Sequence, residues 1–160
     1  MDREIIATIY SAAAFVIILL MLSIIKNKLA VNIYVNIESD RILIKSDTEE
    51  VVLEPIIYVS LEGKKRDLLG IGNIDVPKLP SERINLFENI DSVGLPQKRY
   101  CFQIFFRHAF RVVSRRKYLV FVKVTIRGTS NLESLFQGEQ DREMWKVLRG
   151  AGAIECHFLP

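Results

Sequence analysis

A run of residues without a charge, Ile5 to Ile25, lies near the start of the chain. As a helix that rises about 1.5 Å per residue, this run is long enough to cross the hydrocarbon core of a bilayer, which is about 30 Å thick. A cleaved signal peptide is the competing interpretation. However, the preceding residues MDRE do not form a basic leader region, and the following residues KNKL do not form a small-residue cleavage site. The pattern therefore favours a transmembrane anchor.

The charges beside this run predict its orientation. Lys26 and Lys28 follow the run, whereas Asp2, Arg3 and Glu4 before it carry a net negative charge. Because basic residues are enriched on the cytoplasmic side of membrane helices, the C-terminal side is expected in the cytoplasm. We therefore predict that residues 1–28 form a single-pass anchor in the cell (inner) membrane and that residues 29–160 form one cytoplasmic domain.

The first half of this domain has the pattern of β-strands. Ala30–Asn36 (AVNIYVN), Arg41–Lys45 (RILIK) and Val51–Ser60 (VVLEPIIYVS) are rich in valine, isoleucine and tyrosine. The polar breaks between them are too short for crossover helices, so an antiparallel meander is expected. Asp67–Ile71 is a candidate fourth strand. Prolines punctuate the following stretch, residues 72–96, which we expect to be a loop with at most one helical turn.

The period then changes to that of a helix. Between Gln97 and Arg115 the apolar residues recur at the spacing of one helix face: Phe102, Phe105, Phe106, Ala109, Val112 and Val113. The next apolar run, Tyr118–Ile126 (YLVFVKVTI), is nearly continuous. Such a run is typical of a strand that is buried on both faces of a sheet.

A second helix and a last strand complete the pattern. Glu139–Arg149 is expected to be helical with Met144, Trp145 and Leu148 turned inward, and Ala153–Leu159 is expected to be a strand. The order of the elements predicts the α/β class, with a mixed sheet that is antiparallel at first and parallel afterwards, and with two main helices.

Composition limits the chemistry that this chain can perform. Of its 160 residues, 49% are hydrophobic, which excludes intrinsic disorder. Two cysteines, Cys101 and Cys156, are too few for a disulfide scaffold or for a four-cysteine zinc site. Cys156 and His157 are adjacent on a predicted strand and so face opposite sides of it. We therefore expect neither a metal nor a cofactor.

The net charge of +3 is small, but the charges are unevenly distributed. No acidic residue occurs between Ser92 and Asn131, whereas nine lysines and arginines do. Arg107, Arg111 and Arg115 lie one helical turn apart, on the side away from the phenylalanines. The residues predicted to contact lipid or a protein partner are Lys98, Arg99, Arg107, Arg111, Arg115, Arg116 and Lys117. A solvated helix face is the alternative interpretation, and nucleic-acid binding lacks support because the aromatic residues are needed for the core.

Several stretches resemble the first subdomain of bacterial actin homologues, most closely the MreB family. In that family a strand ending in D-L-G-T precedes strands of the types TLIYV and IVLNEPSVVAI. The similar segments here are Arg41–Ile44, Val51–Ser60 with its Glu54-Pro55 pair, Asp91–Leu95 (family turn DGVI), Tyr118–Ile126 (VVICVPSG, without its proline) and Ala151–Pro160 (AGAREVYLIEEP). The resemblance implies an actin-like, ribonuclease H-like fold for residues 29–160, as a truncated form of that subdomain.

The resemblance also implies a degenerate phosphate loop. Counting back from Leu43, the D-L-G-T loop of the family falls on Asn36, Ile37, Glu38 and Ser39. The family's glycine lets the backbone approach the phosphates, and its aspartate serves the metal. Glu38 instead places a carboxylate there, and like charges about 4 Å apart oppose each other by about 4 kcal/mol at an effective dielectric of about 20. With the family's second nucleotide-binding domain also missing, we expect no nucleotide binding, no catalytic residues and no enzymatic activity.

Three hypotheses about function follow. The favoured one is a non-enzymatic, membrane-anchored cytoplasmic interaction module related to MreB, acting in bacterial cell shape or envelope organisation. Its expected partners are membrane lipid and a cytoskeletal or envelope-assembly protein. The alternatives are a scaffold component of a secretion or pilus platform, and a non-functional truncated MreB-like remnant. The sequence does not indicate an oligomeric state.

Overall fold

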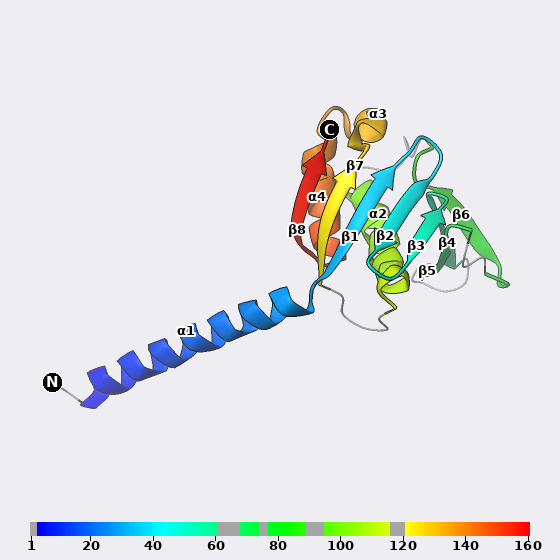
Figure 1. Ribbon diagram of the computed structural model, residues 1–160. Helices are drawn as coiled ribbons and strands as arrows, with labels where there is room; N and C mark the ends of the chain where they lie inside the picture. Colours follow the sequence, from blue (N-terminus) through cyan, green and yellow to red (C-terminus); the bar gives the residue numbers. More distant parts are fainter. Residues whose placement is uncertain (1–2, 61–67, 74–76, 89–94, 116–120) are drawn as a thin grey trace. The chain divides into compact units, whose positions relative to one another are not determined.

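The structure is a computed structural model that describes residues 3–60, 68–73, 77–88, 95–115 and 121–160. Figure 1 shows the elements along the chain. The chain divides into two compact units, Met1–Ala30 and Val31–Pro160.

The first unit consists of helix α1 (Arg3–Leu29). An 18-residue window within it, Ile9–Lys26, is apolar enough to cross a membrane, and none of that window is buried. The helix therefore lacks the burial that the core helix of a soluble protein would have. Its length and composition suit a membrane span, and a signal sequence near an N-terminus shares both properties.

The second unit is built on a five-stranded mixed sheet. Its strands are β1 (Val31–Ile37), β2 (Ile42–Ser46), β3 (Glu50–Leu53), β7 (Val122–Arg127) and β8 (Ala153–Leu159), in the order β3-β2-β1-β7-β8. Strand β2 is antiparallel to both β1 and β3, whereas β1, β7 and β8 run parallel. The predicted α/β class with a mixed sheet is confirmed.

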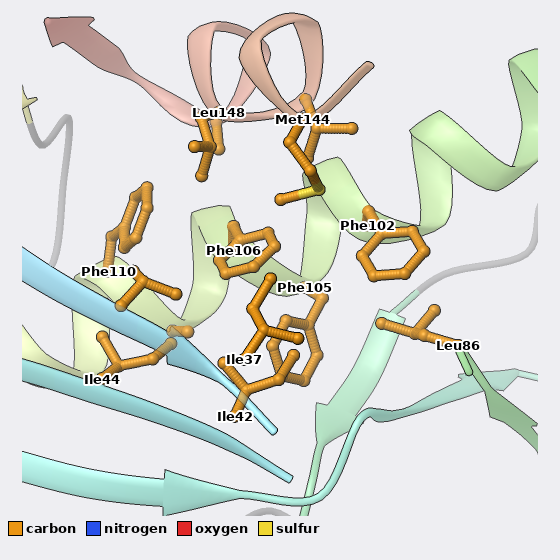
Figure 2. Packing of buried hydrophobic residues seen from close by; sticks show 14 of the residues in the cluster. Ile37, Ile42, Ile44, Leu86, Phe102, Phe105, Phe106, Phe110, Met144 and Leu148 are labelled. Atoms are coloured by element: carbon orange, nitrogen blue, oxygen red, sulfur yellow. The ribbon is translucent and has the colours of Figure 1, made fainter. Parts of the chain in front are cut away.

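Helices α2 (Leu95–Ser114) and α4 (Gln140–Ala151) lie on the same face of this sheet (Figure 1). Figure 2 shows the phenylalanines of α2 between the strands and α4. Phe102, Phe105, Phe106 and Phe110 are completely buried, together with Ala109, Val113, Met144 and Leu148. The predicted inner face of the first helix is therefore confirmed except for Val112, which is only half-buried, and Phe110 is added to it.

One residue of the second helix was predicted wrongly. Trp145 is only half-buried, whereas Met144, Val147 and Leu148 are buried. These three residues follow the helical spacing of one face, and Trp145 lies about 100° away from Met144 around the helix axis. Between β7 and α4 the chain also forms the short 3-10 helix η1 (Thr129–Leu132) and the short helix α3 (Glu133–Phe136).

Strand β7 is not buried on both faces, contrary to the expectation for Tyr118–Ile126. Val122, Val124 and Ile126 are buried against the helices, whereas Lys123 and Thr125 alternate with them on the opposite face. Within the described part of the unit Val31–Pro160, no helix covers that opposite face (Figure 1). The residues 118–120 of the predicted strand lie outside the described residues.

The predicted strand Val51–Ser60 is two strands that belong to different sheets. It breaks at Glu54 and Pro55, after which β4 (Ile56–Ser60) joins a separate three-stranded antiparallel sheet. Proline supplies no N–H to a ladder and pre-sets its own backbone angle, so the chain changes direction there. The Ile56 N–H donates to the Glu54 carbonyl at 2.8 Å and closes this tight turn.

The small sheet has the order β5-β4-β6, with β5 (Leu68–Ile71) and β6 (Ser81–Asn85) on either side of β4. Strand β5 agrees with the candidate fourth strand. Strand β6 lies in the stretch that was predicted to be a loop, so that prediction was wrong. Its only apolar residue, Ile84, pairs with Ile57 of β4. Pairing with an existing strand, and not the local pattern, creates this element.

Candidate functional site: an arginine-lined pocket

The starts of three parallel strands meet at one edge of the large sheet. The N–H of Val31, the first residue of β1, donates to the Phe121 carbonyl at 2.9 Å. The N–H of Val122, the first residue of β7, donates to the Gly152 carbonyl at 3.3 Å, just before β8 begins. The end of α4 and the start of β1 are therefore linked at this edge through the start of β7.

A pocket of about 300 Å³ opens at this edge. Its walls come from the second half of α2, from the residue before β7 and from the end of α4. The lining residues are Arg107, Arg111, Phe121, Arg149, Gly150, Ala151 and Gly152. The volume is at the lower end of the range for small-molecule sites, which suits a small charged group.

The packing of the two helices places the three guanidinium groups. Arg107 and Arg111 are one turn apart on α2, on the face left over once the phenylalanines have turned to the core. Arg149 belongs to the last turn of α4. Nη2 of Arg107 donates to the Gly150 carbonyl at 2.6 Å, and Nε2 of Gln103 donates to the same oxygen at 3.1 Å.

The position of the Gln103 amide depends on Gly150. A Cβ atom at that position would lie 2.5 Å from the amide end of the Gln103 side chain. A side chain there would therefore displace the Gln103 amide from the Gly150 carbonyl. Arg107 is held at the mouth of the pocket by one of its five donors, and the other donors remain for a ligand.

The carbonyl groups at the end of α4 would by themselves repel an anion. A helix C-terminus is equivalent to about half a negative elementary charge. These carbonyls already have donors, however, since the Gly152 N–H donates to the Leu148 and Arg149 oxygens and Arg107 donates to Gly150. Three guanidinium charges exceed half a charge of opposite sign, so the pocket is electropositive.

The structure divides the predicted basic residues into two groups. Arg99 forms an ion pair with Glu143, and Arg115 forms one with Glu49 at 3.0 Å. Within the part of the chain that the structure describes, no carboxylate forms an ion pair with Arg107, Arg111 or Arg149. Lys98 is half-buried on α2, and Arg116 and Lys117 lie outside the described residues.

Arg99 therefore has a partner within the unit, and its contact with lipid or another protein stays a prediction. Its partner Glu143 is 2% exposed and also accepts from Nζ of Lys146 at 2.7 Å. Burial alone would raise the pKa of Glu143, but the hydrogen bond from Lys146 and the charges of Arg99 and Lys146 outweigh it and lower that pKa. This group ties the start of α2 to the start of α4, away from the pocket at the end of α4.

Arg149 is the pocket residue that sequence reasoning missed. Its position in the last turn of α4 is ordinary for a basic residue, because cations there interact favourably with the helix dipole. Nothing in its sequence spacing relates it to Arg107 and Arg111. Only the packing of α4 against α2 brings the three side chains to one pocket.

The predicted phosphate-loop positions lie at the other end of β1. Asn36 and Ile37 are its last residues, and Glu38 and Ser39 begin the turn to β2. Nδ2 of Asn36 donates to Glu38 at 3.2 Å, and Glu38 also forms an ion pair with Arg41. The carboxylate that sequence reasoning placed at a glycine position is thus held by its own neighbours.

The backbone at this end is also occupied. Nδ2 of Asn131 donates to the Ile37 carbonyl at 2.8 Å. Gly128, at φ +79°, approaches so closely that a Cβ atom there would lie 2.1 Å from the same oxygen. The loop after β7 therefore fills the space beside the end of β1.

The described residues offer little support for a metal site, a reactive thiol or a second charged pocket. No group of three or more histidine, cysteine, aspartate or glutamate side chains is placed there to hold a metal ion. Burial, with a smaller contribution from Asp141, raises the pKa of Cys156 to about 12, so its thiol stays protonated at neutral pH and is a poor nucleophile. A cavity of about 370 Å³ near the β1–β2 turn is lined by two carboxylates and two guanidinium groups, Asp40, Glu54, Arg41 and Arg83. The charges of these four side chains sum to zero.

No family model and no curated protein matches this chain. Among solved structures, the chain is similar to MreB 5 of Spiroplasma citri, which was crystallised bound to AMPPNP. The identity is 15% and the TM-score is 0.48; the match covers 81% of this chain and 38% of that protein. The likeness concerns the course of the backbone and carries no information about the ligands or activity of this chain.

Proposed function

We propose that this chain is a non-enzymatic, membrane-anchored interaction module, with the unit Val31–Pro160 in the cytoplasm of a bacterial cell. Helix α1 is the anchor. The sequence resemblance to bacterial actin homologues supports a cytoskeletal or envelope-assembly protein as the partner, and a role in cell shape or envelope organisation.

The observation that carries this proposal is the apolar surface of α1. The window Ile9–Lys26 is long enough for a bilayer, and none of its residues is buried. Exposed apolar surface costs about 25 cal/mol per Å² in water, so a bilayer is the natural environment of this helix. Lys26 and Lys28 lie in its last turn, where the positive-inside rule supports a cytoplasmic location for the residues that follow.

The non-enzymatic part of the proposal draws on the contacts at the end of β1. Glu38, Asn36 and the Ile37 carbonyl all have partners within the chain. A nucleotide phosphate would have to displace these contacts and approach a carboxylate. The electropositive pocket at the opposite edge has the features of a binding site and holds no residue able to act as a nucleophile or a base at neutral pH.

Membrane fractionation of the full chain tests the anchor. We expect the protein in the membrane fraction, resistant to alkaline and high-salt washes. Leu19→Arg places a charge in the middle of the span and is expected to reduce insertion strongly, since a charge at a helix centre costs about 3 kcal/mol. Leu19→Ile is the matched control and should leave insertion unchanged.

Reporter fusions at the C-terminus test the topology. A cytoplasmic fluorescent reporter should be active there and alkaline phosphatase inactive. The reverse pattern, or release of a protein that lacks α1 after cleavage, would overturn the proposal in favour of an exported protein with a signal sequence.

A further inference from the structure

We propose that the pocket formed by Arg107, Arg111 and Arg149 binds the phosphate group of an acidic phospholipid headgroup. This site rests on the proposed function, because it requires α1 to cross the membrane. It would give the second unit a defined contact with the membrane surface, in addition to its covalent anchor.

The lack of a carboxylate partner among the described residues points to an anionic ligand. Other arginines of the second unit have a carboxylate partner within it: Arg99 pairs with Glu143, and Arg115 pairs with Glu49. The three pocket arginines come from two helices, yet no carboxylate of the described residues pairs with any of them. Guanidinium groups present planar, paired N–H donors that match the oxygens of a phosphate.

Chain connectivity points to a lipid as the source of the phosphate. A single residue, Ala30, separates the last residue of α1 from the first residue of β1. That first residue, Val31, is hydrogen-bonded to Phe121, which itself lines the pocket. Since a residue spans at most about 3.6 Å, a helix that ends at the headgroup region leaves the start of β1 close to it.

The composition of the pocket wall agrees with a phospholipid. Phe121 and Ala151 add apolar atoms next to the arginines, and these atoms can contact the first carbons of the acyl chains while the arginines bind the phosphate. The cytoplasmic leaflet also carries a negative surface potential that attracts basic residues close to it. A free phosphate could occupy the same donors, so the experiment has to separate these two sources.

The test uses the full chain purified in a neutral detergent. Short-chain phosphatidylglycerol, short-chain phosphatidylcholine and inorganic phosphate are titrated separately, and the thermal unfolding midpoint is followed through the fluorescence of the single tryptophan, Trp145. A ligand that binds only the folded state raises the midpoint in a concentration-dependent way. We expect this rise with phosphatidylglycerol, and not with phosphatidylcholine or with phosphate at the same concentrations.

The variants Arg111→Gln and Arg149→Gln test the pocket without removing a contact within the described chain. Each is expected to weaken the apparent affinity about fivefold, and the two together about twenty-five-fold, because a basic residue near an anionic surface changes affinity by about that factor. Arg127→Gln is the matched control: this arginine is exposed on β7, outside the pocket, and should leave the affinity unchanged. Arg111→Lys should fall between the native chain and Arg111→Gln.

The outcomes are distinct. An equal response to inorganic phosphate, with the same dependence on the arginines, would overturn the lipid as ligand. A response to phosphatidylglycerol that is the same in the Arg111→Gln/Arg149→Gln double variant and in Arg127→Gln would overturn the pocket as its site. The double variant still contains α1 and should stay in the membrane fraction; its release from membranes would instead count against the proposed function.

Discussion

The two ends of strand β1 differ in how their polar groups are used. At the carboxyl end, Glu38 is held by Asn36 and Arg41, and Asn131 occupies the Ile37 carbonyl. At the amino end, three guanidinium groups surround an open pocket without a carboxylate partner among the described residues.

The difference shows where a ligand would find available interactions. Charged residues occur at both ends, so charge content alone does not distinguish a binding site from a structural cluster. A group that is already paired must lose its partner before it can bind, which costs about as much as the new contact gains. The pocket arginines have no carboxylate partner among the described residues and so avoid this cost, which is why the amino end is the proposed binding site.

The largest expected effect concerns the core that both ends share. Phe105 is completely buried and points toward Ile37 and Ile42 in Figure 2. Phe105→Ala should lower the free energy of unfolding by about 3 to 5 kcal/mol, because it removes a buried ring and leaves a cavity. Urea unfolding of the full chain in neutral detergent, followed by Trp145 fluorescence, measures this change.

Tyr100→Ala on the same helix is the control for Phe105→Ala. Tyr100 is 58% exposed, so its loss should change the free energy of unfolding by less than about 0.5 kcal/mol. Equal effects of the two substitutions would mean that the inner face of α2 has been assigned wrongly. A large loss of unfolding free energy for Phe105→Ala alone is the expected result, since only Phe105 lies in the core that both ends of β1 share.

The next effect tests whether the loop after β7 fills the space at the carboxyl end of β1. Gly128→Ala forces a Cβ atom to within 2.1 Å of the Ile37 carbonyl oxygen, at a residue with φ +79°. We expect a loss of about 3 kcal/mol or more, from backbone strain together with the displaced strand end. The same unfolding experiment measures it.

Gly138→Ala separates the two causes. Gly138 also has a positive φ, +83°, but nothing lies within 4 Å of a Cβ atom placed there. Its substitution should therefore cost only the strain of a left-handed residue, about 1 to 2 kcal/mol. If Gly128→Ala costs no more than Gly138→Ala, the loop after β7 does not fill the end of β1 as described.

A smaller effect concerns the ion pair of Arg99 with Glu143, which joins the start of α2 to the start of α4. The pKa of Glu143 is lowered in the folded protein, so its carboxylate stabilises the fold at neutral pH, and this contribution is lost as the pH falls below about 4.5 through the folded pKa. Glu143→Gln should cost about 2 kcal/mol at pH 7, and it should reduce the loss of stability between pH 4.5 and lower values. Unfolding curves across this pH range test the sign.

Glu139→Gln is the matched substitution for Glu143→Gln. Glu139 pairs with Arg142 on the exposed side of α4, with both side chains more than half exposed. Exposed pairs contribute about 0 to 1 kcal/mol, so this variant should follow the native pH dependence closely. An equal pH response of the two variants would show that Glu143 does not act as the buried link between α2 and α4.

Local pattern predicted most of the fold, and the exceptions have physical causes. The α2 face follows from helical spacing, because one side of that helix is buried in the core, and β8 follows from its apolar run, of which Cys156 and Phe158 pack against the core. Strand β6 could not be predicted from spacing, because it has a single apolar residue, Ile84, which pairs with Ile57 of β4. The break at Pro55 was underestimated because the apolar residues continue on both sides of it, although the two halves join different sheets.

The candidate site was predicted in part. Arg107 and Arg111 belong to a stretch of the sequence, Ser92 to Asn131, that has basic but no acidic residues, and both line the pocket. Sequence reasoning could not separate them from Arg99 and Arg115, because the carboxylates that neutralise those two residues lie far away in the chain. Ion pairing between distant segments, and the approach of Arg149, exist only in the folded unit.

The smallest expected effect is at the degenerate phosphate loop, where we predict that Mg-ATP produces no measurable heat with the full chain at millimolar concentration. A polyphosphate there would face the Glu38 carboxylate, and like charges about 4 Å apart oppose each other by about 4 kcal/mol at an effective dielectric of about 20. Asn36→Asp combined with Glu38→Gly restores the residue types of the family loop, but it should not create binding, because Asn131 and Gly128 still occupy the Ile37 carbonyl. Isothermal titration calorimetry of both proteins is the measurement. A micromolar dissociation constant for the native chain that Asn36→Ala or Ser39→Ala weakens would reverse the comparison and make the carboxyl end of β1 the binding site.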